Sequence, residues 1–325
     1  MSKPKKPKPI AVKKQVDPQR TRAVRRVTLH TFAALAFAAM LVVGVAYLRA
    51  HVEKRVVFPD RPPKVVLVNR PAWMSDFLAE QITAAVRPIG THSAFDHQML
   101  VDIDAMLRTN PWIKRVNRVR RAYDKKPADT VEIDCEYRAP IALVHWRDYY
   151  WLVDGDGVKL PEQYTADQLP RITMGSNRRL NIRVVEGVGQ PPVESGERWP
   201  GDDLAAGLDL VKLLHGQPFA EEVVKVDVSN YEGRQSRRDA HLTLVTRYNT
   251  QIRWGRPVNS KDFFIEVSPA QKLTYLRQVY EQFHRIDANQ PAIDIRFDKI
   301  TYPSAPPLPQ QGTEPPRTAH ADPSR

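Results

Sequence analysis

Residues 130–137 read T-V-E-I-D-C-E-Y, a run in which apolar and acidic side chains alternate. This period of two residues predicts a β-strand with one buried face, formed by Val131, Ile133 and Cys135. Just before it, residues 113–121 favour a second strand that is very basic and alternates poorly. Two consecutive strands are therefore expected in this part of the chain.

Two helices and one strand are expected upstream of this pair. Residues 65–68 favour a strand, and residues 98–108 favour a helix. A further helix is expected over residues 71–86, where apolar side chains recur at helical spacing. These side chains are Trp73, Phe77, Leu78 and Ile82. The expected order is strand, helix, helix, strand, strand.

A second, β-rich region begins at Pro140. Residues 141–146 and 149–154 look like a hairpin, and Asp154-Gly155-Asp156-Gly157 predicts another chain reversal. Strands are also expected at 223–228, 240–248, 250–255 and 292–302.

Two helices are expected among these strands. The first is capped by Asp202 or Asp203 and ended by Gly216, with an apolar stripe of Leu204, Leu208 and Val211. The second starts at Ser268-Pro269-Ala270-Gln271, a serine cap followed by proline at the first helical position. Its stripe is Leu273, Leu276, Tyr280 and Phe283. The fold class is therefore α+β, with a mixed β-sheet domain and flanking helices.

Residues 27–48 read V-T-L-H-T-F-A-A-L-A-F-A-A-M-L-V-V-G-V-A-Y-L and contain no charged side chain. A helix of this length spans about 33 Å, enough to cross a bilayer, so a single-pass membrane anchor is expected. A cleaved signal peptide stays open as the alternative, because Gly44-Val45-Ala46 resembles a cleavage site and Arg25-Arg26 resembles a twin-arginine signal.

The positive charge of the chain is concentrated before this segment. Residues 1–26 hold ten Lys or Arg and one Asp, which is +9 of the net +12. A basic cytoplasmic tail and export of the remainder are therefore expected, with a charged stalk at 49–61. No basic face for nucleic acid is expected. The last segment, 303–325, carries seven prolines and is expected to be a disordered tail.

The sequence contains no catalytic motif. The chain is therefore expected to have no enzymatic activity, no cofactor site and no small-molecule substrate. Asp154 and Asp156 resemble the opening of a calcium loop, but Lys159 stands where that loop needs glycine, and a tight turn is favoured. Metal binding is not expected at His92, His97, Asp102 and Asp104. Cys135 is the single cysteine and is expected to behave as a small apolar core residue.

The run N-P-W-I-K-R-V at 110–116, followed by the strand at 130–137 and by Y-Y-W-L-V-D-G-D-G-V at 149–158, resembles the bacterial cell-division protein family FtsQ/DivIB. The similarity extends to I-R-W-G-R-P at 252–257 and I-D-I-R-F-D at 293–298, and covers roughly residues 60–302. Leu67-Val68-Asn69 and the long Tyr123–Pro127 segment depart from the family pattern.

The resemblance implies a POTRA domain at 62–138 and an FtsQ-type β domain at 139–302. It also implies a non-catalytic scaffold of the inner membrane at the division septum, in a complex with FtsB and FtsL. A POTRA-containing protein-secretion or assembly factor is the alternative.

The resemblance places the partner-binding site on the last strand, which FtsB would extend by strand addition. The matching residues are Arg296, Phe297, Asp298, Lys299, Ile300 and Tyr302. Alternation puts Phe297 on the face of Ile293 and Ile295, so whether it fills the core or touches the partner stays open. Arg296 points the other way, where it can pair with a partner carboxylate. A proline at Lys299 is expected to weaken FtsB binding more than an alanine does.

Overall fold

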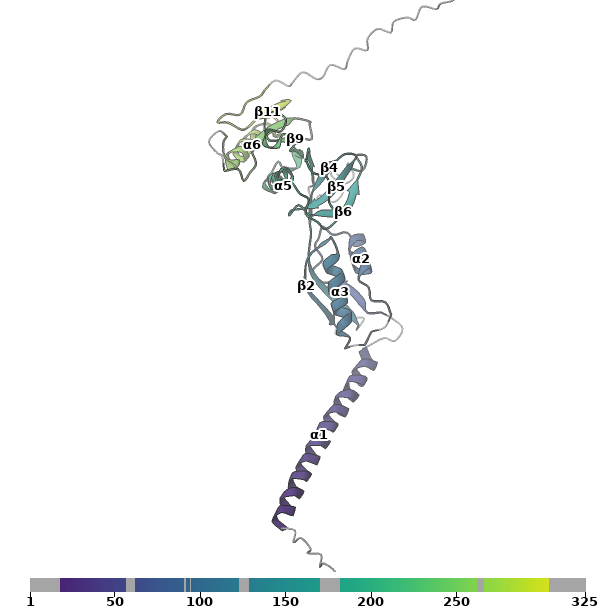
Figure 1. Ribbon diagram of the computed structural model, residues 1–325. Coiled ribbons are helices and arrows are strands. Elements are labelled where there is room, and N and C mark those ends of the chain that lie inside the picture. Colours follow the sequence, from purple (N-terminus) through teal and green to yellow (C-terminus); the bar gives the residue numbers. More distant parts are fainter. Residues whose placement is uncertain are drawn as a thin grey trace, which may run out of the picture. The chain divides into compact units, whose positions relative to one another are not determined.

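The computed structural model describes residues 18–56, 62–90, 92–93, 95–122, 129–169, 182–261 and 266–303 (Figure 1). Most of the expected basic tail and Pro-rich tail, the end of the stalk and the Tyr123–Pro127 segment lie outside these residues. The chain forms two compact units. The first comprises residues 1–64, 88–99 and 121–130, and the second comprises 65–87, 100–120 and 131–325. The domain limits 62–138 and 139–302 stay predictions.

The first element is a long helix, α1 (Pro18–Val56). Its segment Arg25–Lys54 is long and apolar enough to cross a membrane, and its apolar side chains are exposed. The Thr31 hydroxyl donates to the Val27 carbonyl oxygen at 3.0 Å, so this polar group is satisfied within the helix. Helix α1 continues to Val56, into the residues 49–61 that are expected to form the stalk.

A three-stranded sheet follows, and the order strand, helix, helix, strand, strand is confirmed. Its elements are β1 (Lys64–Leu67), α2 (Asp76–Ala85), α3 (His97–Thr109), β2 (Ile113–Ala122) and β3 (Thr130–Tyr137), and the strands lie in the order β1-β3-β2. Val131, Ile133 and Cys135 are buried, as the alternation predicts. The Asn69 side chain bonds both the N–H and the C=O of Cys135, at 3.3 and 2.9 Å. The Asn69 side chain thereby replaces one further main-chain pair with β3, just beyond the end of β1.

The helix predicted from residue 71 begins at residue 76. Ser75 caps it, because its hydroxyl oxygen accepts the Leu78 N–H at 3.1 Å. Trp73 therefore lies before the helix, where its ring centre is 6.3 Å from that of Trp112. Phe77 is 72% exposed, so its placement on the buried stripe was wrong.

The second sheet has eight strands in the order β11-β10-β9-β8-β7-β4-β5-β6. It is mixed, since β10 with β11, β7 with β8 and β4 with β7 pair in parallel and the other neighbours are antiparallel. The strands are β4 (Pro140–Trp146), β5 (Tyr149–Asp154), β6 (Lys159–Tyr164), β7 (Arg183–Glu186), β8 (Val223–Asp227), β9 (Leu242–Thr246), β10 (Gln251–Gly255) and β11 (Ala292–Asp294).

Helix α5 (Asp202–Leu214) connects the parallel strands β7 and β8 and packs on them. Its stripe is buried as predicted, and Gly216 has the left-handed φ of +79°. The predicted aspartate cap was wrong, because Gly201 occupies the cap position. Asp203 instead accepts the Gly189 N–H from the preceding loop at 2.7 Å.

Helix α6 (Pro269–Phe283) begins as predicted, with the Ser268 hydroxyl accepting the Gln271 N–H at 3.3 Å. Of its predicted stripe, Leu273 and Leu276 are buried, whereas Phe283 at the last position is exposed. The stripe also includes Lys272, which sequence patterning did not predict. Its buried ammonium bonds Glu266 and the Trp254 carbonyl oxygen, both at 2.7 Å.

Candidate functional site

The predicted strand from Ala292 to Tyr302 is broken in the structure. Strand β11 pairs with β10 through Ile293 and Ile252, but it ends at Asp294. The chain then turns and comes back at Thr301. Asp294 and Thr301 exchange two backbone hydrogen bonds, of 2.8 and 3.0 Å, as an antiparallel pair. The outer edge of β11 is therefore covered at Asp294 by the protein's own backbone.

A buried ion pair makes this turn. The Asp294 carboxylate accepts the backbone N–H of Arg296 at 3.1 Å and its guanidinium Nη2 at 2.6 Å. Arg296 is buried and also donates to the Arg238 carbonyl oxygen at 3.2 Å. The hydrogen bond to Asp294 raises the pKa of Arg296 above its ordinary value. The expectation that Arg296 points outward to a partner carboxylate was therefore wrong, since its carboxylate belongs to the same chain.

Helix α6 and the residues before it hold the turn from the other side. The Val267 N–H donates to the Arg296 carbonyl oxygen at 2.8 Å. The Tyr275 hydroxyl donates to the Asp298 carbonyl oxygen, also at 2.8 Å. Both bonds go to main-chain atoms, so they fix the path of the backbone and leave the Asp298 side chain exposed.

The side chains beyond Arg296 fall on two sides of the turn. Ile295 is buried, as is Ile293, but Phe297 is 42% exposed because the strand has ended before it. Its ring centre lies 5.0 Å from the Arg296 guanidinium. Ile300 is half-buried against the core. The remaining predicted residues, Lys299 and Tyr302, are exposed. The structure thus places Phe297 at the surface, outside the core.

The returning segment lies outside β11 and is joined to it by the single bridge between Asp294 and Thr301, and we treat it as the border of the sheet. In an antiparallel pair, neighbouring residues direct their N–H and C=O groups to opposite sides. Because Thr301 directs its groups to Asp294, those of Ile300 and Tyr302 face away from the sheet. Within the described residues, no backbone hydrogen bond involves either of them. We call this border, residues 300–303, the 300–303 edge.

The sequence signal for this edge is the polar pair Asp298-Lys299 between the apolar runs that end at Phe297 and begin at Ile300. Such a pair favours a turn between two short strands. Reading residues 292–302 as one strand missed the turn, and with it the role of Thr301.

Two other places that the sequence singled out have structural roles. The Asp154 carboxylate accepts the N–H groups of Asp156 and Val158 at 2.9 and 2.8 Å, so the tight turn is confirmed. His92 pairs with Asp96 at 2.9 Å. Within the residues that were searched, which are the described ones, no group of three or more His, Cys, Asp or Glu could hold a metal ion.

Cys135 is buried on β3, and burial raises the pKa of its thiol to about 11. A thiol that stays protonated at neutral pH is a poor nucleophile.

Comparison with protein-family models and with curated proteins finds no match for this chain.

Proposed function

We propose that the chain is a non-catalytic, membrane-anchored scaffold of bacterial cell division that binds an FtsB-type partner by strand addition at the 300–303 edge. The observation that carries the proposal is the unpaired backbone of Ile300 and Tyr302 at the end of the eight-stranded sheet. An extended segment can add to such a border with main-chain hydrogen bonds, while side-chain contacts set its register.

The edge is held in position before any partner arrives. Its inner side is fixed by the two bonds between Asp294 and Thr301, and the turn is fixed by Val267 and Tyr275. A border that is already ordered costs less entropy to bind than a loose segment. In this arrangement Arg296 positions the edge, and the exposed rings of Phe297 and Tyr302 supply contact area for the partner.

The cell-division role and the POTRA and FtsQ-type domain identities are supported by the motifs at 110–116, 130–137, 149–158, 252–257 and 293–298. The apolar segment of α1 supports a single-pass anchor in the inner membrane. The excess of Lys and Arg before it favours a cytoplasmic N-terminus and exported sheets. FtsL and FtsB are the partners that the resemblance implies for a scaffold of this kind.

The strand-addition step is tested by Tyr302→Pro against Tyr302→Ala in the full-length protein. Both variants remove the ring, but only proline removes the outward N–H that a partner strand would use. The affinity for the FtsB-type protein of the same bacterium should be about tenfold lower for the proline variant than for the alanine variant. The difference corresponds to the loss of one main-chain hydrogen bond to the partner, with disturbance of the adjacent ones. Affinity is measured in detergent, and thermal unfolding confirms that both variants fold.

Lys299→Pro is the matched control. Lys299 lies in the turn before the 300–303 edge, so its N–H is outside the stretch that a partner strand would pair with, and Tyr302 replaces it as the position to test. Lys299→Pro should bind nearly as well as Lys299→Ala. Equal affinities for the two Tyr302 variants would refute strand addition. Recovery of secretion components in place of division proteins, on co-purification from membranes, would refute the cell-division role.

A further inference from the structure

Ile89 is 95% exposed, the highest exposed fraction of any large apolar side chain among the residues that the structure describes. It lies in the loop between α2 and α3, next to Gly90, whose φ of +81° favours glycine. Phe95 in the same loop is 48% exposed. We call residues 88–96 the 88–96 loop, of which the structure describes all but 91 and 94. Two large apolar side chains left exposed in one short loop indicate a surface that contacts a partner or a membrane.

The 88–96 loop is held in place by a buried ion pair. The Arg121 guanidinium bonds the Asp129 carboxylate at 2.6 Å, and both side chains are at most 5% exposed. Arg121 also donates to the His92 carbonyl oxygen at 3.0 Å. The His92 ring bonds the Asp96 carboxylate at 2.9 Å and the Ile89 carbonyl oxygen at 3.2 Å. Ile89 is therefore presented by a loop whose backbone is tied to the folded unit.

Helix α1 sets the level of this loop against a bilayer. The helix and the 88–96 loop belong to the same compact unit. The guanidinium carbon of Arg49 on α1 lies 4.9 Å from the centre of the Phe95 ring, a cation–π contact. Arg49 directly follows Leu48, the last residue of the charge-free segment 27–48. Because that segment is about as long as the hydrocarbon core is thick, Arg49 and the ring on it reach the lipid head groups when α1 spans a membrane.

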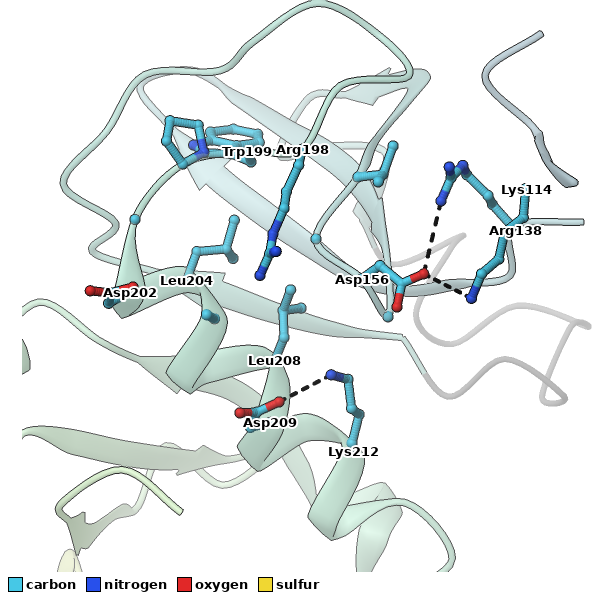
Figure 2. Close-up of a pocket in the computed structure, with 16 residues that line it drawn as sticks. Lys114, Arg138, Asp156, Arg198, Trp199, Asp202, Leu204, Leu208, Asp209 and Lys212 are labelled. Atoms are coloured by element: carbon cyan, nitrogen blue, oxygen red, sulfur yellow. Dashed lines mark hydrogen bonds and ion pairs between the residues drawn. The ribbon is translucent and has the colours of Figure 1, made fainter. Parts of the chain in front are cut away.

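The pocket beside α5 offers a different kind of surface (Figure 2). It has a volume of about 940 Å³, and Leu208 at its base is buried. Two ion pairs stand at its walls, one between Lys114 and Asp156 at 2.8 Å and one between Lys212 and Asp209 at 3.0 Å. These charged groups are satisfied within the chain, whereas the Ile89 side chain gains contacts only by meeting something outside it.

We propose that the 88–96 loop binds the surface of the membrane that α1 spans, with Ile89 among the acyl chains just below the head groups and Phe95 at the head-group level. Aromatic rings are enriched at this level, and apolar side chains at such a surface are buried at the boundary between head groups and acyl chains. A second contact beside the helix restrains how this unit tilts against the bilayer. The inference rests on the proposed anchor in α1 and is independent of partner binding at the 300–303 edge.

The test uses the full-length protein in vesicles of phosphatidylcholine and phosphatidylglycerol, with the fluorophore NBD attached to Ile89→Cys. The unchanged chain, whose single cysteine is buried, is the labelling blank. Lipids that carry a nitroxide just below the head groups should quench this label more strongly than lipids with a nitroxide near the bilayer centre. Phe77→Cys, an exposed apolar position in the other compact unit, is the matched control and should keep its fluorescence.

A second label, on Pro88→Cys, keeps Ile89 in place and reports on its role. Adding Ile89→Asp should lower the equilibrium constant for the membrane-bound loop at least about tenfold, because the burial of one isoleucine is lost. Quenching of the Pro88 label should fall accordingly, and Phe77→Asp should leave it unchanged. Equal quenching of that label in the two aspartate variants would overturn the proposal.

A third label, on Ala38→Cys in the middle of the apolar segment, separates the loop from the anchor. Quenching at Ala38 from the bilayer centre, with no more quenching at Ile89 than at Phe77, would overturn the loop proposal and leave the anchor standing. No quenching at Ala38 would overturn both. Ile89→Asp should leave binding of the proposed FtsB-type partner in detergent intact, so failure at the 300–303 edge is recognised separately.

Discussion

The eight-stranded sheet ends differently on its two sides. At the β6 end, Lys159 donates its N–H to Glu197 at 2.9 Å and accepts the Gly196 N–H at 2.8 Å, so a loop covers the strand where it begins. Two residues on, Pro161 has no N–H to offer. At the other end, the main-chain groups of Ile300 and Tyr302 have no hydrogen-bond partner among the residues that the structure describes. Proteins normally protect sheet edges against added strands, and the open edge is therefore the side where we propose that a partner binds.

The largest effect on stability is expected from Arg296→Ala, which removes the cation that holds the turn before the 300–303 edge. It leaves the Asp294 carboxylate buried without its main partner, and breaking a buried pair in this way costs about 3 to 5 kcal/mol of unfolding free energy. Urea unfolding measures this loss. Binding of the proposed FtsB-type partner should weaken as well, because the turn that presents the 300–303 edge is released.

Arg253→Ala is the matched control for this prediction. Its guanidinium lies 3.9 Å from the same Asp294 carboxylate but is partly exposed, so its removal should cost less than about 1 kcal/mol. If both variants lose the same stability, the Asp294–Arg296 pair does not hold this end together.

Lowering the pH is expected to have a smaller effect on stability, through Asp287, which contacts Thr250 just before β10. The Thr250 hydroxyl at the start of β10 donates to Asp287 at 3.2 Å and to the Gln290 carbonyl oxygen at 2.8 Å. Burial raises the pKa of Asp287, but hydrogen bonds from Arg285, Asn289 and Thr250 outweigh burial, and the net pKa is below the ordinary value.

A carboxyl whose pKa is lower in the folded state stabilises the fold above its unfolded pKa, about 3.9, and loses that contribution as pH falls toward the folded value. The contribution of Asp287 to the unfolding free energy should therefore stay constant from pH 7 to about 5 and should decrease below about pH 4. In Asp287→Asn that part of the decline should be missing. An unchanged acid profile in this variant would show that other carboxyls set the acid stability.

The sequence predicted best those features of the fold that are determined by a few neighbouring residues. The β3 strand at 130–137 and the start of α6 at Ser268 came out as predicted, since alternation and a helix cap act within a few residues. The position of Phe77 was mispredicted, because a period of 3.6 does not tell which turn of a short helix reaches the core.

The candidate site was predicted only in part, for a non-local reason. The six residues from Arg296 to Tyr302 do lie at the end of the sheet, but residues 292–302 form a strand, a turn and a returning edge. The turn depends on burying Asp294 with Arg296, and that burial needs Arg238 and Val267, which are distant in sequence. No pattern within residues 292–302 contains that information. The Asp298-Lys299 pair was the one local sign of a turn.

The smallest effect is expected at the closed end, from Pro161→Thr. Pro161 is exposed and lies in the irregular part of β6, where the register with β5 shifts between the Val153–Lys159 and Trp151–Gln163 pairs. Threonine at 161 restores the N–H that this last strand lacks there. The stability should change by less than about 1 kcal/mol, since proline contributes mainly by restricting the unfolded chain.

The effect of Pro161→Thr should appear as association, because an edge with its donors restored can pair with a second edge. The variant should sediment as larger species at protein concentrations where the unchanged chain does not, whereas Glu162→Thr, which adds no N–H, should sediment like the unchanged chain. If Pro161→Thr does not associate, the covering loop alone closes this end. The loop at 194–198 alone would then account for the difference between the two ends, and the absence of such a loop would be enough to leave a border open.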